Sequence, residues 1–570
     1  MSALQPGLPV VAMPADASNA QNAAPPPSSP STSTPPARRP SAPSSEHTLA
    51  DHDSVDLEKG EGKKESPDSE GVNEKAANKG SKSGAPGGGP PAEEEDPFLV
   101  TLKGRDHLNP HTWAVWYRWA LTGVAGLLVL NATFASSAPS GLIPDLMERF
   151  DVSQEVGVLT ISIFVAGYCV GPLLWGPLSE RYGRRLVFLF VWPFYTGFQV
   201  GCALSPNIGA LLVFRFLGGC FASSPLTNSG GVIADLWDAD RRGDALAIFA
   251  LMPFAGPALA PMISGFMAVR GVNWPWIFWL LTCFAGLCAF FIVFALPETY
   301  VPYILHVEAK RLRKETGDDR WHSPMDKKEA EGIKAVLDRT VLKPFRMIVE
   351  EPMLLVITLY MSFVYGIVYL LFEAIPIVFE GQYGLNAGQS GMVFLALLSG
   401  GFLAVCLYIG YFNRVYMKKH HAMRPKMVPP EVRLQPLLYA APLLAVSFFW
   451  FGWTGAWGDS VSKWSPIVAI GTLGGTVLFV FLSGFNYLID CYLWNAASAL
   501  AINTVVRSAF GAGFPLFSNQ MFSTLTIQGA SSLLGGIAII FVPVPFLLMK
   551  YGKRIRGMSK NAVVLDGPKD

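Results

Sequence analysis

The chain has 570 residues, of which 51% are hydrophobic and only 15% are charged, and its formal net charge is +1. Soluble globular proteins carry about 25% charged residues, and a soluble protein this apolar would expose large adhesive patches. The composition excludes an ordinary cytosolic enzyme and indicates a protein that crosses a membrane several times.

The charge is divided unevenly along the chain. Residues 1–97 hold 15 acidic and 8 basic side chains, whereas the other residues hold 28 acidic and 36 basic ones. The basic residues lie between apolar runs instead of on one soluble face, so no nucleic-acid partner is expected. The seven cysteines all fall in apolar stretches without metal-ligand spacing. We therefore predict neither a disulfide framework nor a metal site.

Residues 1–97 form the first predicted segment. They contain no Phe, Trp or Tyr and hold 16 of the 44 prolines. Such a segment buries too little apolar surface to offset its chain entropy. We predict a disordered cytoplasmic tail, followed by a segment at 98–118 that precedes the first membrane helix.

Beyond residue 118 the chain alternates apolar runs with short polar breaks. A bilayer core needs about 20 helical residues, and twelve runs meet this length. They lie near 119–139, 156–175, 186–205, 208–233, 244–268, 275–296, 353–379, 388–412, 435–455, 466–490, 494–521 and 529–550. We predict an all-α membrane protein with two six-helix halves, 119–297 and 352–550, joined by a central loop at 298–351 and ended by a tail at 551–570.

The placement of Lys and Arg predicts the orientation of these helices. The breaks after the second, fourth, sixth and eighth helices and the C-terminal segment from Lys550 hold 28 basic residues, and the opposite breaks hold 3. Basic loops stay on the cytoplasmic side. Both termini and the central loop are therefore expected in the cytoplasm.

The central loop begins with a stretch, residues 304–314, in which apolar and basic side chains alternate at helical spacing. A basic amphipathic helix on the anionic inner leaflet is one interpretation. A solvated linker helix is the other.

The break after the second helix reads GPLSERYGRR over residues 176–185. Its glycines permit a tight turn and close helix approach, and its acid and bases can pair and exchange partners as helices shift. The segment resembles the loop motif of the major facilitator superfamily at every key position. The resemblance implies a fold of twelve helices in two pseudo-symmetric halves that rock about a central cavity.

Arg215 lies inside the fourth predicted helix. A guanidinium in the bilayer interior is costly and suggests a function, and the family resemblance implies a role in proton coupling. The alternative is an arginine whose side chain reaches the outer membrane surface.

The fifth predicted helix carries GPALAPMISG over residues 256–265. It resembles the antiporter motif of the drug:proton branch, although Ala260 and Ser264 stand where the family has glycine. Its prolines and small residues predict a bent, closely packed helix.

Further segments resemble the fungal drug:H⁺ antiporters with twelve spans, over roughly residues 98–550. They are LNPHTW (108–113), DLWDADRRGDA (235–245), LPETY (296–300), RLRKETG (311–317), NYLIDCY (486–492) and RSAFGAGFPLF (507–517). The resemblance implies a monomer in the plasma membrane, with the vacuolar membrane as the alternative.

Polar and aromatic side chains inside the predicted helices are the candidate site residues. For proton coupling or transport we select Arg215, Glu373, Asp490 and Arg507. For the substrate cavity we select Asn131, Asn228, Tyr365, Tyr369, Phe372, Asn486 and Tyr487. For the conformational motif we select Gly176, Glu180, Arg181, Gly183, Arg184, Arg185, Asp235, Gly256 and Pro257. Glu373 or Asp490 is alternatively a structural partner of a base such as Arg507.

No Walker sequence, nucleophile elbow or helical His/Glu cluster is present. We therefore expect a transporter that is not an enzyme, has no cofactor and is driven by an ion gradient. The predicted function is proton-coupled efflux of amphipathic organic compounds such as drugs, toxins or secondary metabolites, glycolipids among them. A polyamine exporter of the same fold and a nutrient sensor that no longer transports are the alternatives.

Overall fold

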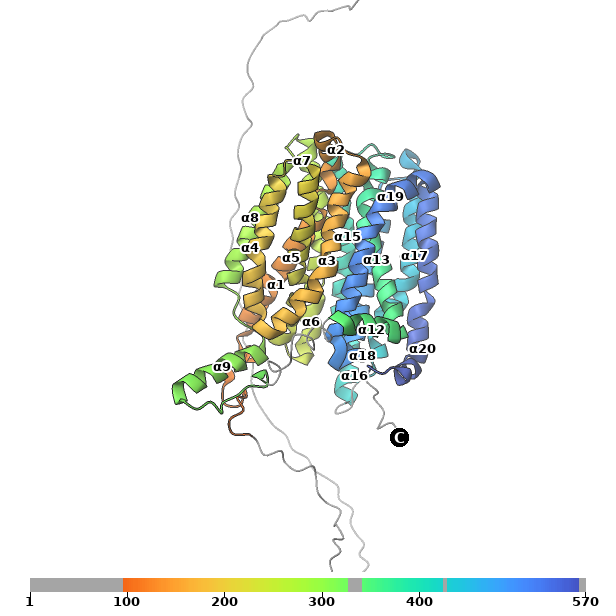
Figure 1. Cartoon of the computed structure of the whole chain (residues 1–570). Coiled ribbons are helices and arrows are strands. Elements are labelled where there is room, and N and C mark those ends of the chain that lie inside the picture. The colour runs from red at the N-terminus through yellow and green to blue at the C-terminus, as the bar shows by residue number, and fades with distance from the viewer. Residues whose placement is uncertain (1–95, 327–340, 424–427, 563–570) are drawn as a thin grey trace, which may run out of the picture. The chain divides into compact units, whose positions relative to one another are not determined.

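The computed structural model describes residues 96–326, 341–423 and 428–562. The predicted disordered tail at 1–97 lies almost wholly outside the described residues, as do the middle of the central loop and the end of the C-terminal tail. The described residues form a helical bundle whose two halves stand side by side (Figure 1).

The first half is built from seven long helical segments. They are α1 (Val115–Ser137), α3 (Gln154–Tyr182), α4 (Arg184–Ala203), α5 (Ile208–Leu236), α6 (Ala239–Phe249), α7 (Met252–Val269) and α8 (Pro275–Phe294). The fifth predicted helix is thus two segments, α6 and α7. Pro253 has no N–H to donate to the carbonyl of Phe249, so the helix is interrupted at residues 250–251.

The second half is built from helices of very different lengths. They are α13 (Pro352–Phe379), α14 (Ala387–Met392), α15 (Phe394–Leu407), α16 (Arg414–Met423), α17 (Gln435–Gly455), α18 (Trp464–Tyr492), α19 (Ala496–Phe541) and α20 (Pro543–Met558). A π-helical turn at Tyr408–Asn413 joins α15 to α16.

Eleven helical stretches in the described residues are long and apolar enough to cross a membrane. The last stretch, Ala496–Met558, has 63 residues and contains two of the predicted helices. They meet at Thr526, whose φ of 63° and ψ of 170° are not helical. The twelve-helix prediction is therefore confirmed, with α19 and α20 sharing the last two spans.

The second predicted helix ends later than predicted. Residues 176–182 were predicted as part of a break whose glycines permit a tight turn, but α3 continues through them to Tyr182. The turn is made by Gly183 alone, whose φ is +86°. Proline is tolerated inside a membrane helix when neighbouring groups satisfy the freed carbonyl.

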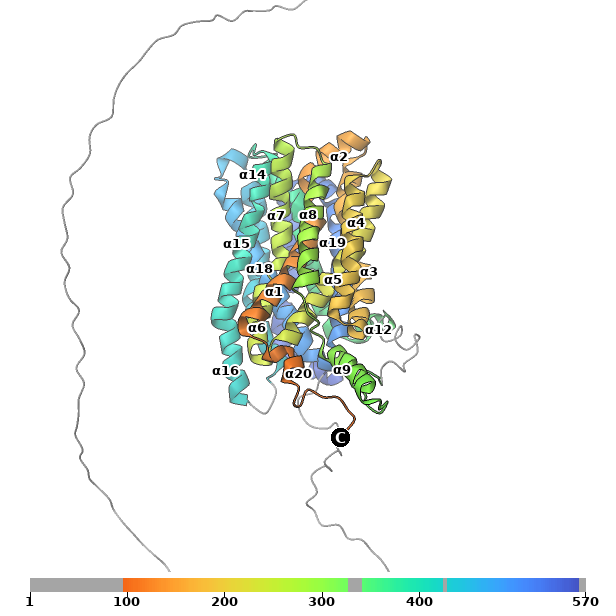
Figure 2. The same cartoon turned by 90° about the vertical axis from the view of Figure 1, so that its left-hand side faces the viewer.

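The two halves meet along two seams. Helix α3 packs against α19, and α7 packs against α14 and α15. At one end of the bundle lie α2 (Ile143–Phe150) and α14; at the other end lie α9 (Val301–Thr316) and α12 (Lys343–Glu350) (Figures 1 and 2). We call these the α2 end and the α9 end.

Helix α9 contains the basic amphipathic helix that was predicted from the side-chain pattern at the start of the central loop. Its apolar face is covered by protein: Leu305 and Ala309 are buried against Val100, with Trp321 packed beside them. The covering segment is held by an isolated bridge between Leu99 and His322. The chain before α1 therefore contacts much of the face that was expected to meet either lipid or water.

Candidate functional site: a central cavity between the two halves

A cavity of about 1170 Å³ lies between the halves. Its walls include side chains from α1, α3, α5 and α7 on one side and from α13, α18 and α19 on the other. It reaches the α9 end, where Tyr182, Lys343 and His420 line it. The predicted residues that line the cavity are Gly176, Glu180, Arg181, Arg184, Asn228, Pro257, Tyr365, Tyr369, Asn486, Asp490 and Arg507.

Three residues that were predicted to line the cavity do not line it in the described structure. Asn131 is fully buried within the first half, where its Oδ1 accepts a hydrogen bond from Tyr195 at 2.7 Å. Tyr487 donates to the sulfur of Met353 at 3.0 Å, and the ring of Phe372 stacks on Phe394. These side chains project into helix–helix interfaces, so their assignment to the cavity is corrected here.

The α2 end is closed by direct contact between the halves. Gly265 of α7 touches the start of α14 in the other half, and beside this contact the amide N–H of Gly141 donates to Ser264 Oγ at 3.1 Å within the first half. A Cβ at Gly265 would overlap the carbonyl oxygen of Ala387, so only glycine permits this approach. Ser264, which stands at a glycine position of the antiporter motif, accepts its hydrogen bond within the first half, next to this closure.

The rest of the antiporter motif packs against α1. Gly256 is buried where α7 crosses α1 at Thr133, and Pro257 faces the cavity. The motif thus links the cavity wall at one end of α7 to the closure at the other. This arrangement agrees with the close packing that its small residues predict.

Glu373 belongs to the same closed region. Its Oε2 accepts a hydrogen bond from Gln154 Nε2 at 3.4 Å, across the two halves, and only 6% of the residue is exposed. Gln154 also accepts from Asn519 Nδ2 of α19 at 3.1 Å. Among the residues that the structure describes, no cation lies within ion-pair distance of Glu373, so its proposed pairing with Arg507 is not formed.

Asp490 lies at the α9 end of the cavity. Its Oδ2 accepts from Arg433 Nε at 2.9 Å and from the hydroxyl of Tyr416 at 3.5 Å. Arg433 in turn lies over the Tyr416 ring, 3.4 Å from its centroid. Asp490 is therefore the partner of Arg433 and not of Arg507.

Arg215 is fully buried and does not reach the membrane surface. Its guanidinium donates to the backbone carbonyls of Thr160 at 2.8 Å, Ala135 at 2.7 Å and Ser136 at 3.0 Å, and it lies 4.1 Å from the Phe164 ring centroid. The alternative of a side chain that reaches the outer surface is thus wrong. Three carbonyls from α1 and α3 satisfy the cation, so it joins these helices to α5.

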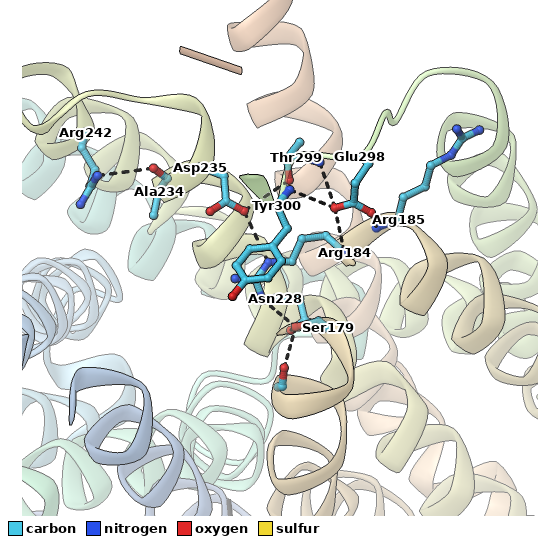
Figure 3. A network of polar contacts seen from close by, with 11 residues as sticks. Ser179, Arg184, Arg185, Asn228, Ala234, Asp235, Arg242, Glu298, Thr299 and Tyr300 are labelled. Carbon is cyan, nitrogen blue, oxygen red and sulfur yellow. Dashed lines mark hydrogen bonds and ion pairs between the residues drawn. The ribbon is translucent and has the colours of Figure 1, made fainter. Parts of the chain in front are cut away.

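The loop motif forms a polar network at the α9 end (Figure 3). Arg184 donates to Ser179 Oγ at 2.5 Å and pairs with Asp235 at 3.5 Å. Ser179 Oγ donates to Asn228 Oδ1 at 2.9 Å. Arg185 donates through its side chain to the carbonyl of Val293 at 3.1 Å. The network joins α3, α4 and α5 within the first half.

Glu298 lies at the centre of this network. It was not among the predicted site residues. Its carboxylate accepts from the amides of Arg184 at 2.9 Å and Arg185 at 3.1 Å, the first two residues of α4 (Figure 3). It also accepts from the amides of Thr299 and Tyr300. A Cβ at Gly183 would collide with Glu298, so this glycine provides both the turn and room for the carboxylate. Glu298 belongs to the LPETY segment (296–300), whose resemblance to the family was the sequence feature that could have identified it.

A contact between the two halves was also not predicted. Asn413, at the end of the π-helical turn, donates to Asp244 Oδ1 of α6 at 2.7 Å. Tyr408, at the start of the turn, accepts from Asn486 Nδ2 at 3.3 Å. π-Helical turns often occur at functional sites. No sequence pattern predicted this one.

The sequence matches a model of the Major Facilitator Superfamily over residues 125–515. The multidrug transporter mdrA of Aspergillus fumigatus is 39% identical over 474 residues, covering 83% of this chain and 77% of that protein. The multidrug transporter FLU1 of Candida albicans is 36% identical over 473 residues, with the same coverage of both chains. The efflux pump FUB11 of Gibberella moniliformis is 37% identical over 462 residues, covering 81% and 77%.

Solved structures share the fold at low sequence identity. The proton:xylose symporter XylE has a TM-score of 0.55 and 15% identity, over 77% of this chain and 96% of its own. The human organic anion transporter MFSD10 has a TM-score of 0.53 and 17% identity, over 76% and 99%. Together with the helical arrangement and the loop motif, these matches establish that the chain belongs to the Major Facilitator Superfamily and is similar to fungal multidrug efflux transporters.

Proposed function

We propose that the protein exports amphipathic organic compounds, such as drugs, toxins or secondary metabolites, in exchange for protons. The observation that carries this proposal is the central cavity, which is about 1170 Å³ in volume, rich in aromatic side chains and closed at the α2 end by contacts between the halves. Cavities with apolar walls and a few polar groups suit drug-sized amphipathic molecules. The names of the relatives, multidrug transporters and efflux pumps, support the same function.

The orientation follows from the basic loops. If the α9 end faces the cytoplasm, as the Lys and Arg distribution indicates, the cavity opens to the cytoplasm in this conformation. It is then the conformation that loads substrate from inside the cell. We assign the protein to the plasma membrane by its similarity to the fungal exporters.

Proton exchange is assigned to Glu373. Burying an ionised carboxylate is costly unless it is paired, and its hydrogen-bond partner Gln154 is neutral. Opening of the α2 end would separate Glu373 from Gln154 and expose the carboxylate to water, where it ionises readily. Proton release and uptake would thus be tied to opening and closing of that end.

The loop motif is assigned to a latch at the other end. Glu180 and Arg181 line the cavity together with Ala497 and Ser498 of α19, while Arg184 is held by Asp235. We propose that Glu180 and Arg181 contact α19 when the α9 end closes. Glu180→Ala or Arg181→Ala should lower transport at unchanged surface abundance; normal transport in both variants would contradict the latch.

The polyamine alternative receives less support. Six Lys or Arg side chains line the cavity, against the two carboxylates of Glu180 and Asp490, and Asp490 is already paired with Arg433. A polycation would meet more positive than negative charge. A sensor that no longer transports would not need the loop motif and the antiporter motif, which this chain keeps.

Inside-out membrane vesicles from cells that express the chain test the function. An acid interior should drive uptake of fluorescent amphipathic compounds, and a protonophore should abolish it. Spermine should not be taken up. Uptake no greater than in vesicles without the protein would contradict the proposal.

A further inference from the structure

The cations that line the cavity are held in different ways. Arg184 pairs with Asp235, Arg433 pairs with Asp490, and Lys343 donates to Asn495 Oδ1 at 2.6 Å. Arg507 is different, because within the part of the chain that the structure describes its Nε has no acceptor and three aromatic rings lie around the guanidinium. Its guanidinium carbon lies 4.5 Å from the ring centroid of Tyr365.

Two more rings complete this aromatic surround. The centroid of Phe481 lies 5.5 Å from the guanidinium carbon and that of Phe485 lies 5.6 Å from it. All three rings, like Arg507 itself, line the cavity. Rings at these distances attract a cation through their faces, but they accept no conventional hydrogen bond.

The guanidinium therefore has unused donor capacity. Its Nε is buried and has no hydrogen-bond partner among the described residues. Leaving a buried donor without an acceptor is unfavourable. Arg215 shows the contrast: its guanidinium is satisfied by three carbonyls and lies outside the cavity wall. Arg507 is positioned for an acceptor that enters the cavity.

We propose that Arg507, with Tyr365, Phe481 and Phe485, binds amphipathic organic anions. The carboxylate or sulfonate of the substrate would accept from the guanidinium, whose planar fork matches such groups. Its aromatic or aliphatic body would lie against the rings. Cations outnumber carboxylates on the cavity wall, which also favours a negatively charged substrate. This inference rests on the proposed function and narrows its substrate class.

The test compares two probes of nearly equal shape. Naphthalene-2-sulfonate is ionised at every working pH, whereas naphthalene-2-sulfonamide is neutral near pH 7. Binding of each to the purified full-length protein is measured by titration calorimetry. A charge-assisted hydrogen bond is worth about 1.5–3 kcal/mol, so the protein should bind the sulfonate about 10–100-fold more tightly.

Variants assign this preference to one residue. Arg507→Gln should reduce the preference for the sulfonate to less than about 3-fold, and Arg507→Lys, which keeps the charge but loses the fork, should leave an intermediate value. Lys343→Gln removes another cation of the cavity wall and should keep most of the preference, because Lys343 adds only to the general positive field of the wall. If Arg507→Gln does not fold, the reduced preference of Arg507→Lys still tests the role of this residue.

Each outcome decides between the two proposals. Equal binding of both probes by the unmodified protein, or an undiminished preference in Arg507→Gln and Arg507→Lys, overturns the anion site and leaves the exporter intact. Equal losses of preference in Lys343→Gln and Arg507→Gln also overturn it, because a diffuse field would then be responsible. Binding of neither probe overturns the anion site, and failure of vesicle uptake separately overturns the exporter.

Discussion

The hydroxyl groups of Ser136 and Tyr369 lie 3.0 Å apart and join α1 of one half to α13 of the other. The carbonyl of Ser136 accepts from Arg215, and the hydroxyl of Tyr369 lies 3.4 Å from that of Tyr365, whose ring contacts Arg507. A continuous set of contacts thus links the buried cation of the first half to the cation on the cavity wall. Movement of the halves must break this set at Ser136 and Tyr369.

Tyr369→Phe tests that contact. The variant keeps the ring and removes the hydroxyl that bonds to Ser136, at a cost of about 1 kcal/mol to this conformation. The population of the conformation open at the α2 end should rise about fivefold. Distances between spin labels on the loops of the α2 end measure this population. Tyr439→Phe, on an exposed ring, is the control, and an equal shift in both variants would refute the role of the contact.

Gly265→Leu tests the closure itself. The added side chain must displace the backbone of Ala387, so α7 and α14 cannot meet as they do here. The same spin-label distances should lengthen in most molecules, and export should fall at least tenfold because the cycle requires both conformations. Gly286→Leu is the control, since nothing lies within 4 Å of a Cβ at Gly286. Unchanged distances in Gly265→Leu would show that the closure tolerates a side chain.

Glu298→Ala tests the cap of α4. Loss of the carboxylate leaves the amides of Arg184 and Arg185 without their acceptor, which should cost about 2 kcal/mol. Those amides should exchange with deuterium roughly 30-fold faster. Glu350→Ala, at an exposed position, should leave their exchange unchanged. Protection of α4 equal to that of the unmodified protein would mean that Glu298 is dispensable.

The ionised carboxylate of Asp326 should stabilise α9 at neutral and at mildly acidic pH. Asp326 accepts from His306 Nδ1 at 2.7 Å, from Arg313 at 2.6 Å and from the amide of Ser323 at 2.8 Å. Partial burial raises the pKa of Asp326, but the Ser323 amide and the charges of Arg313 and His306 outweigh it and lower the pKa below its usual 3.8. The ionised form is therefore favoured by folding.

Because the pKa is lowered in the folded state, the contribution of Asp326 is complete above pH about 4 and is lost as pH falls through the lowered value. Deuterium exchange of α9 should be equally slow at pH 7 and pH 5 after correction for the intrinsic rate. Asp326→Asn should exchange faster at both values. Fast exchange of the unmodified α9 at pH 5 would show that another group governs its stability.

The helices were predictable because bilayer thickness imposes their length, which a single sequence displays directly. The side of each helix that faces the cavity was less predictable. A membrane helix is apolar both where it meets lipid and where it packs on protein, so Asn131 and Tyr487 looked like cavity residues and are interface residues. Glu298 was quoted as part of a motif, but a carboxylate that caps a helix more than 100 residues earlier leaves no local pattern.

Proton movement by reconstituted protein tests the central claim most directly. The protein is placed in liposomes with a pH-sensitive dye inside, and an amphipathic substrate is added. We predict that the unmodified protein moves protons when the substrate is added. Glu373→Gln should bind the substrate and move none, whereas Glu380→Gln, just beyond the end of α13, should behave like the unmodified protein. Substrate transport without proton movement, or undiminished proton movement in Glu373→Gln, would contradict the account.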